Sequence, residues 1–409
     1  MDAAPRIAVV GIGADGWAGL GEAARAAIRA AGEIVGARRQ LDLLPADVRD
    51  HATLRAWPSP MDPLIDELAE RAHGMPATCV LASGDPMLHG IGATLARRLG
   101  PSRLDVHPHP SAFALACARL GWPSADVELV STVARAPETV ARALAPGRRV
   151  VVYATGEDGA AKVARTLRAR GYGPSRFVVL ERLGAPDERI VDATADAWGG
   201  RWADPLHAIA IACRAAPGTR LLQRSPGLPD EAYDGDGQLT KRHVRAITLA
   251  ALQPLPGQLL WDVGAASGSI AIEWLRAEPS ARAIAFEPRK DRAQQARANA
   301  LALGVPELDV RVGRAPQALE GLEPRPDAIF VGGGVATPGL VAACWDALAP
   351  RGRLVANAVT LEGEQALIAA RNAYGGELVR IEIAQAEPLG AFTGWRAQRP
   401  VVQWAAHKP

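Results

Sequence analysis

Two stretches of sequence decide the fold: RIAVVGIGADG at Arg6–Gly16 and LLWDVGAASGSI at Leu259–Ile270. In each, an apolar segment runs into glycines and then into residues suited to a helix, the pattern of a buried strand that turns into a helix. Glycine suits such a turn because it adopts positive φ and lets a ligand approach the backbone closely. Two turns of this kind, spelled differently, predict two cofactor-binding domains fused in one enzyme.

The overall composition is that of a globular protein with several domains. A chain of 409 residues corresponds to roughly two to three domains by length alone. Hydrophobic residues make up 48% of it, which is enough to form large cores. Lys and Arg number 46 against 44 Asp and Glu. This near balance disfavours a nucleic-acid-binding protein, because such proteins usually carry a strongly basic face.

The sequence has no signal-peptide pattern at its start and no apolar run long enough to span a membrane. We therefore expect a soluble, cytoplasmic protein that binds neither membrane nor nucleic acid, and we expect it to form a homo-oligomer. Its cysteines lie in apolar segments without a CxxC pair and are expected to be buried thiols. The HxH pair at His107 and His109 lacks accompanying ligands, so no metal site is expected.

Short apolar runs alternate with alanine-rich helical stretches along the chain, which predicts an α/β protein with largely parallel sheets. In the first part we expect strands at Ile7–Val10, Ile34–Gly36, Thr78–Ala82, Val127–Leu129, Val150–Tyr153, Phe177–Glu181 and Ala208–Ala212. In the second part we expect them at Leu259–Val263, Arg282–Glu287, Leu308–Val312, Ala328–Val331, Arg353–Asn357 and Leu378–Ile383. The second part therefore resembles a doubly wound, Rossmann-like sheet.

One segment, LQRSPGLPDEAYDGDG at Leu222–Gly237, breaks this alternation. Its prolines, glycines and acids follow no period, which is the composition of a linker. We therefore predict a first domain over residues 1–220, a linker over 221–237 and a second domain over 238–409.

The second glycine turn favours S-adenosylmethionine (SAM) over a dinucleotide. Gly264 and Gly268 are four residues apart in DVGAASGS, which departs from G-x-G-x-x-G, and SAM has no pyrophosphate that needs a tight cradle. Glu287 ends the next strand, about 20 residues on, where an acid accepts hydrogen bonds from ribose hydroxyls. The alternative is a surface acid after a strand.

Three further segments are candidates for this site. Gly313–Ala315 follows the third strand, where an adenine edge would lie, and Gly332–Gly334 follows the fourth, beside the transferring methyl. Thr240 either caps the next helix or contacts the cofactor. Lys241, Arg242 and Arg245 form either a solvated helix face or a site for a polycarboxylate substrate, because Lys and Arg bind carboxylates.

These motifs together resemble the cobalamin-pathway methyltransferases that methylate and decarboxylate a precorrin. The resemblance rests on QLTKRHVRAITLAAL, LLWDVGAASGSIAIEWL, IAFEP, VGRAPQAL, PDAIFVGGG and NAVTLE, in this order from Gly237 to Glu362. It implies that SAM is bound by Thr240, Gly264, Ala265, Ala266, Ser267, Gly268, Glu287, Gly313 and Ala315. Substrate would meet Lys241, Arg245, Gly332 and Gly333. Arg314 stands where this family usually has an acid.

One interpretation of the first glycine turn is an NAD(P) site. Gly11, Gly13 and Gly16 satisfy G-x-G-x-x-G, and Glu33 follows about 20 residues on, as in NAD(P)-binding folds. The loop SGDP at Ser83–Pro86 also follows an apolar strand and can offer carbonyls and amides to a ligand.

The set VVGIGADG, IVGARRQL, SGDPMLHGIGATLARRL and HPHPSAFALACARLGWP resembles the tetrapyrrole methylases, in particular their precorrin C5-methylating branch, over residues 6–215. This resemblance implies SAM against Gly84, Asp85, Pro86, Ser111 and Ala112, with Gly11 and Gly13 lining a tetrapyrrole trough. Asp85 is alternatively an acid that stabilises the turn. The segment STVAR at Ser131–Arg135 departs from the family's Ser-Leu-His-Gly-Arg run and lacks its histidine.

The order of the two halves is similar to that of a family of fused precorrin methyltransferases. This implies two SAM molecules per chain, with carbon 5 methylated by the first half. Carbon 15 would be methylated, and the ring C acetate decarboxylated, by the second. The alternatives are a fused NAD-dependent oxidoreductase, or one catalytic half joined to a tetrapyrrole-binding half. No residue is assigned as catalytic acid or base.

Overall fold

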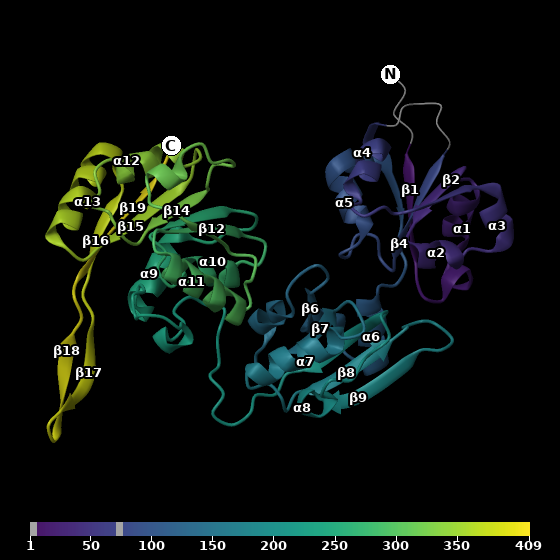
Figure 1. Cartoon of the computed structure of the whole chain (residues 1–409), viewed down its shortest axis with the longest axis horizontal. Coiled ribbons are helices and arrows are strands. Elements are labelled where there is room, and N and C mark those ends of the chain that lie inside the picture. The colour runs from purple at the N-terminus through teal and green to yellow at the C-terminus, as the bar shows by residue number, and fades with distance from the viewer. Residues whose placement is uncertain (1–5, 71–76) are drawn as a thin grey trace. The chain divides into compact units, whose positions relative to one another are not determined.

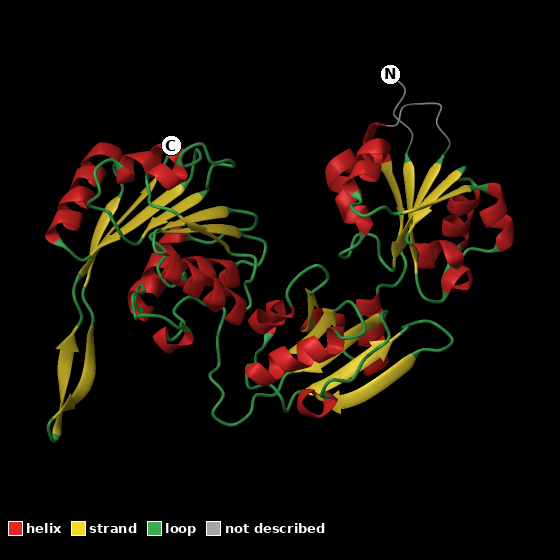
Figure 2. Ribbon diagram, in the orientation of Figure 1, coloured by secondary structure: helices red, strands yellow, loops and turns green. Residues whose placement is uncertain are grey.

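The computed structural model describes residues 6–70 and 77–409, which form two compact units (Figure 1). The first comprises Met1–Pro137 and Pro146–Thr219, and the second comprises Glu138–Ala145 and Arg220–Pro409. Both units contain helices packed on β-sheets (Figure 2). Among the described residues, no helix has the length and apolar character needed to cross a bilayer.

The first unit begins with a five-stranded parallel sheet of order β3-β2-β4-β1-β5. Its strands are β1 (Ile7–Ile12), β2 (Glu33–Gly36), β3 (Thr53–Ala56), β4 (Thr78–Ser83) and β5 (Leu104–His107). Its helices are α1 (Glu22–Arg29), α2 (Arg38–Asp42), α3 (Ala46–His51), α4 (Asp62–Glu70) and α5 (Ile91–Leu99). Apolar side chains of β1 and β4 enter cores on both faces of the sheet, which explains their continuous apolar sequences.

A second, mixed sheet completes the first unit, with the order β6-β7-β10-β8-β9. Only β6 and β7 are parallel, and β10 pairs antiparallel with both β7 and β8. The strands are β6 (Val127–Ser131), β7 (Arg149–Tyr153), β8 (Arg176–Glu181), β9 (Arg189–Thr194) and β10 (His207–Ala212). The helices are α6 (Ala112–Leu120), α7 (Gly159–Ala169) and α8 (Ala195–Trp198).

The second unit is built on a seven-stranded sheet of order β13-β12-β11-β14-β15-β19-β16, in which β19 alone runs opposite to the other strands. The strands are β11 (Leu259–Val263), β12 (Arg282–Glu287), β13 (Asp309–Val312), β14 (Ala328–Val331), β15 (Arg353–Ala358), β16 (Glu377–Ile381) and β19 (Val401–His407). Both faces carry an apolar core. The helices are α9 (Arg242–Leu252), α10 (Ser269–Ala277), α11 (Lys290–Ala302), α12 (Leu340–Ala347) and α13 (Leu361–Tyr374). The predicted doubly wound sheet is thus confirmed.

A separate hairpin, β17 (Ala384–Leu389) with β18 (Phe392–Ala397), projects from the second unit (Figure 1). It forms its own two-stranded sheet and is not paired with the seven-stranded one.

The segment predicted as a linker is packed against the second unit. Leu228 is fully buried and Tyr233 is buried with it in the core beside α9 and α10. The composition predicted a segment without packing of its own, and this prediction is wrong for its central part. Glu273 and Arg245 of the second unit form hydrogen bonds with the segment's backbone.

Candidate functional site

A cavity in the second unit has a volume of about 1140 Å³, and many of its lining residues follow the parallel strands. The strand order reverses between β11 and β14, and ligands of such sheets bind in the crevice at that reversal. Most residues predicted for this half line the cavity: Thr240, Lys241, Gly264, Ala265, Ala266, Glu287, Gly313, Ala315, Gly332 and Gly333. The structure therefore brings together candidates that lie far apart in the sequence.

Ser267 and Gly268 are not among the described residues that line this cavity. Ser267 lines a smaller neighbouring cavity. Gly268 precedes α10 with φ of +76°, and a Cβ there would lie 3.2 Å from the Cβ of Ala296. Close packing against α11 therefore explains why this residue is a glycine.

At Gly264, the loop that follows β11 lies against the loop that follows β14. Its φ is +78°, and a Cβ at this position would lie 3.0 Å from the backbone nitrogen of Gly333. A larger residue would separate the two loops and strain the turn. Glycine here keeps backbone from both strands exposed along one wall of the cavity.

Glu287 is a fixed, buried carboxylate at the end of β12. The residue is 3% exposed, which contradicts the alternative of a surface acid. Its Oε2 accepts a hydrogen bond from the Ala266 amide at 2.9 Å, and its Oε1 accepts one from the Arg289 amide at 3.0 Å. A carboxylate has about four lone-pair sites. Each oxygen therefore keeps acceptor capacity for one of two neighbouring hydroxyl groups, which fits a ribose.

Asp262 is a second buried acid on the cavity wall, and the sequence reading did not identify it. Its Oδ2 accepts a hydrogen bond from the Ala271 amide at 3.1 Å, whereas no described residue donates to its buried Oδ1. Burial raises the pKa of Asp262 to about 7, and the nearby charge of Glu287 acts in the same direction. An unpartnered acceptor beside Glu287 fits a cationic group, and SAM carries an ammonium and a sulfonium. The available sequence signal was an acid ending the apolar run LLWD.

Thr240 and Lys241 line the cavity at the start of α9. The N-cap of this helix is Lys241, without a capping side-chain bond, so the interpretation of Thr240 as a cap is wrong. The Lys241 ammonium donates to the Gly237 carbonyl at 3.2 Å and is exposed. It is therefore available to an anionic group.

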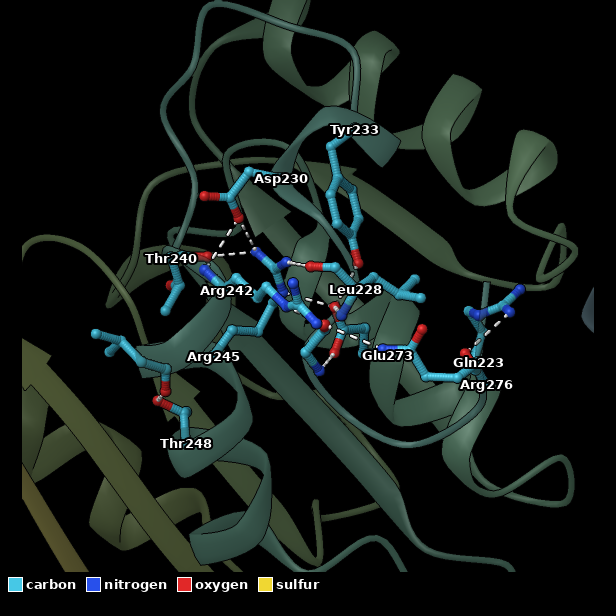
Figure 3. Close-up of polar contacts among 12 residues, drawn as sticks. Gln223, Leu228, Asp230, Tyr233, Thr240, Arg242, Arg245, Thr248, Glu273 and Arg276 are labelled. Carbon is cyan, nitrogen blue, oxygen red and sulfur yellow. Dashed lines mark hydrogen bonds and ion pairs between the residues drawn. The ribbon is translucent and has the colours of Figure 1, made fainter. Parts of the chain in front are cut away.

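Arg245 was predicted to meet substrate, and the structure contradicts this. Its side chain is 0% exposed, and its Nε donates to Glu273 at 2.6 Å. Another guanidinium nitrogen donates to Asp230 at 3.1 Å and to the Thr240 carbonyl, and the third donates to the Leu228 carbonyl. These side chains point toward one another in Figure 3. Arg245 is therefore a structural residue whose donors are occupied inside the protein.

Glu273 explains why the segment around Leu228 is ordered. Its carboxylate accepts hydrogen bonds from the Gly227 amide at 2.6 Å, the Leu228 amide at 3.0 Å and the Tyr233 hydroxyl at 2.8 Å, besides Arg245 (Figure 3). Burial, reinforced by the charge of Glu273, raises the pKa of Tyr233. A buried charge is tolerated only when it is paired and hydrogen-bonded, and here the segment itself supplies the partners.

In the first unit, the predicted glycines lie close to other parts of the protein. A Cβ at Gly11 would meet the Gly84 carbonyl oxygen at 2.0 Å, and one at Gly84, whose φ is +59°, would lie 3.0 Å from the Cα of Ser111. A Cβ at Gly13 would lie 2.5 Å from Asp15 Oδ1. The structure thus brings Gly11, Gly84 and Ser111 together. Packing alone accounts for glycine at these positions.

The loop residues of this site have local structural roles. Asp85 Oδ1 accepts a hydrogen bond from the Met87 amide at 2.8 Å, which is the turn-stabilising role given as the alternative. Ser111 caps α6, whose first residue is Ala112, by accepting from the Ala114 amide at 3.1 Å. Pro86 is buried. A role for these residues toward SAM stays a proposal.

Tyr153, at the end of β7, ties these loops together and was not identified from the sequence. Its hydroxyl accepts a hydrogen bond from the Phe113 amide at 2.9 Å, and burial raises its pKa. Its carbonyl accepts from both the amide and the hydroxyl of Thr132. The STVAR segment is therefore anchored to the same strand end.

Ala134 in that segment has a φ of +55°, a left-handed conformation that costs a residue with a Cβ roughly 1–2 kcal/mol. We expect Ala134→Gly to stabilise the first unit by about 0.5–1 kcal/mol, the gain being reduced by the greater freedom of glycine in the unfolded chain. Denaturant unfolding measures it. The control Ala26→Gly in α1 is expected to destabilise the first unit by about 1 kcal/mol. Equal losses for both variants would contradict the argument.

Each half of the chain matches a known protein family. Residues 6–198 match the model described as tetrapyrrole (corrin/porphyrin) methylases, and residues 231–408 match the one described as precorrin methyltransferase domain. Together with the two folds, these matches define a chain of two methyltransferase domains. The predicted fold class is confirmed: a tetrapyrrole methylase fold followed by a Rossmann-like methyltransferase. The dinucleotide-dependent oxidoreductase is thereby replaced as an interpretation.

Relatives match along nearly the whole length. The precorrin-6Y C(5,15)-methyltransferase [decarboxylating] of Mycobacterium tuberculosis H37Rv is 47% identical over 405 residues, covering 98% of this chain and 100% of the relative. The protein of the same name from a Sinorhizobium species is 43% identical, covering 98% and 96%. This chain belongs to the family of decarboxylating precorrin-6Y C5,15-methyltransferases.

A crystal structure similar to part of this chain is that of the C-terminal domain of precorrin-6Y C5,15-methyltransferase from Rhodobacter capsulatus. It is 47% identical, covers 46% of this chain and 100% of that chain, and has a TM-score of 0.43.

Proposed function

We propose that this chain transfers methyl groups from two SAM molecules to carbons 5 and 15 of precorrin-6Y and removes the ring C acetate carboxyl as carbon dioxide, giving precorrin-8. The observation that carries the proposal is the 47% identity to the Mycobacterium relative, because it extends over both halves of the chain. The cavity that contains Glu287 and Asp262 supports a SAM site in the second half.

We further propose a division of labour between the halves. Residues 1–220 would methylate carbon 5, and residues 238–409 would methylate carbon 15 and decarboxylate. The proposal is supported by the family matches, which assign each half a separate methyltransferase domain. It is also supported by the glycine turn of each half, since each turn ends a strand of its own sheet.

In the second half, the chemistry requires positioning more than a reactive side chain. SAM supplies an electrophilic methyl group, and the attacking atom is an electron-rich ring carbon of the substrate, so no serine or cysteine nucleophile is needed. Glu287 would hold the ribose hydroxyls and Asp262 a cationic group of SAM. The loops at Gly264 and Gly333 would orient its remaining atoms. Lys241 would bind a substrate carboxylate. Orientation of two bound reactants accounts for large rate gains.

Mass spectrometry tests the function directly. The full chain, incubated with SAM and precorrin-6Y, is expected to yield a product that has gained two methyl groups and lost carbon dioxide. A product with two added methyl groups and an intact acetate would contradict the decarboxylation. An unchanged substrate in the presence of folded protein would contradict the proposed function as a whole.

Two SAM sites per chain are a separate proposal. We propose that Gly84, Asp85, Pro86, Ser111 and Ala112 form the second one, and that Gly11 and Gly13 lie near its tetrapyrrole. Titration calorimetry of the full chain with S-adenosylhomocysteine is expected to give two sites per chain. A single site at saturation would overturn the two-site proposal and leave the family assignment intact.

We also propose that the protein forms a homo-oligomer and acts in the cytoplasm. The hairpin β17–β18 supports self-association, because Leu389, Phe392 and Trp395 near its tip are 69%, 80% and 79% exposed. Exposed apolar clusters mark interaction sites. Light scattering of the full chain distinguishes a monomer from an oligomer.

A further inference from the structure

Asn357 lies near the end of β15 and is one of the residues that line the cavity of the second unit. Two strands, β11 and β14, separate β15 from β12, where Glu287 lies. Neighbouring strands are about 4.8 Å apart. Asn357 therefore lies away from the proposed ribose site, toward the other end of the cavity.

Two polar side chains, Thr248 on α9 and Gln403 on β19, fix the Asn357 amide. The Thr248 hydroxyl, on α9, donates to the Val244 carbonyl at 2.8 Å, so its oxygen has only acceptor capacity left. It accepts from Asn357 Nδ2 at 2.9 Å and from Gln403 Nε2 at 3.0 Å. Gln403, on β19, also donates to Asn357 Oδ1 at 3.0 Å. Neither amide can be turned over without placing acceptor against acceptor.

This network is buried behind the cavity wall. Thr248 is 0% exposed and Gln403 is 4% exposed, whereas Asn357 is half-buried. One Asn357 N–H is used by Thr248, and none of the residues 6–70 and 77–409 accepts the other. Two buried partners thus serve to present a single neutral donor at the cavity. Buried polar side chains are costly unless fully paired, so this arrangement needs an explanation.

We propose that the remaining Asn357 N–H binds the carboxylate that is lost, the acetate of ring C, and that Thr248 and Gln403 act as positioning residues for it. The inference rests on the proposed function. In the step itself the bond between the acetate methylene and the carboxyl carbon breaks. Its electron pair enters the conjugated ring system, carbon dioxide leaves, and the methylene takes a proton from water to become a methyl group.

The neutrality of the donor suits this step. Negative charge leaves the carboxylate as the bond breaks, so a fixed cation would stabilise the starting state more than the transition state. A single amide N–H orients the carboxylate with less of this penalty. Cations that line the cavity, such as Lys241 and Arg399, are then left for the carboxylates that the substrate keeps.

The test compares variants of the full chain by carbon dioxide release, product mass and S-adenosylhomocysteine affinity. Asn357→Ala is expected to lower kcat for carbon dioxide release at least about tenfold, since it removes a hydrogen bond to a charged group. Product mass is expected to show retained acetate. Affinity for S-adenosylhomocysteine is expected to stay unchanged, which would not hold if the residue only maintained the fold.

Thr248 provides the second variant and its rescue. Thr248→Val keeps the shape but removes the acceptor that orients both amides, so carbon dioxide release is expected to fall about threefold to tenfold. Thr248→Ser keeps the hydroxyl and is expected to restore it. The matched control is Thr166→Val in α7, a buried threonine that likewise donates to the carbonyl four residues earlier, at 3.2 Å from Lys162 O.

The outcomes separate this inference from the proposed function. If wild-type protein releases carbon dioxide and Asn357→Ala does so at the same rate, the inference fails and the proposed function stands. Equal losses in Thr248→Val and Thr248→Ser would overturn the positioning role. If folded wild-type protein neither methylates nor decarboxylates precorrin-6Y, the proposed function fails and the inference fails with it.

Discussion

Replacing Arg245 with methionine is expected to destabilise the second unit by about 3–5 kcal/mol, because it leaves the buried Glu273 carboxylate without its cationic partner. The variant also leaves the Leu228 and Thr240 carbonyls without their donors. Denaturant unfolding followed by tryptophan fluorescence measures the effect, since Trp261, Trp274 and Trp404 are buried in this unit.

Two comparisons show whether the unpaired charge is the cause. The double variant Arg245→Met with Glu273→Gln is expected to recover a large part of the loss, since it removes both charges. The control Arg380→Met breaks an exposed pair with Glu382, 2.8 Å long, and is expected to change stability by less than about 1 kcal/mol. A loss in Arg245→Met as small as in this control would contradict the argument.

Arg245 also shows a limit of the sequence reading. QLTKRHVR places Lys241, Arg242 and Arg245 near one helix start, and nothing local distinguishes the exposed Lys241 from the buried Arg245. Its partner Glu273 lies in the apolar run SIAIEWL. An acid in such a run can be recognised as buried only when the cation that pairs with it is known. The same absence of long-range information led to the prediction of a linker over 221–237, since the segment's order comes from Glu273 and Arg245.

The buried strands of the sheets were predicted more successfully than the exposed strands. All six strands predicted for the second part are present, with small shifts at their ends. The central ones, such as β11 and β14, are buried parallel strands, which are continuous apolar runs. The antiparallel strand β19 and the hairpin β17–β18 were not predicted. Residues of the hairpin are mostly exposed, so their sequences carry little hydrophobic pattern. In the first part, the peripheral strands β3, β5 and β9 were missed for the same reason.

A glycine that belongs to a ligand-binding motif is not always there because of a ligand. Gly264 was predicted from a motif, and the structure places it on the cavity wall. Gly11 was also predicted from a motif, yet the Gly84 carbonyl occupies the space of its Cβ. A glycine pattern therefore identifies a close approach of backbone, and only the structure tells whether a neighbouring strand or a ligand makes that approach.

Replacing Glu287 with alanine is expected to weaken SAM binding at the site proposed in the second unit. Two hydrogen bonds to a charged group contribute roughly 1.5–3 kcal/mol each before compensation, so the affinity of this site is expected to fall at least about tenfold. Calorimetry with S-adenosylhomocysteine is then expected to detect one strong site, and the site proposed in the first unit serves as an internal reference. Carbon dioxide release from precorrin-6Y is expected to fall with it.

The control for this variant is Glu320→Ala, which removes an exposed acid of the same unit that is not among the residues lining the cavity. It is expected to keep both sites. Glu287 also accepts the amides of Ala266 and Arg289, so circular dichroism must show that Glu287→Ala is folded. Because the two halves are proposed to act separately, the folded variant is expected to methylate carbon 5 of a substrate already decarboxylated and methylated at carbon 15. Loss of that reaction as well would contradict the division of labour, and unchanged affinity at both sites would contradict the role of Glu287.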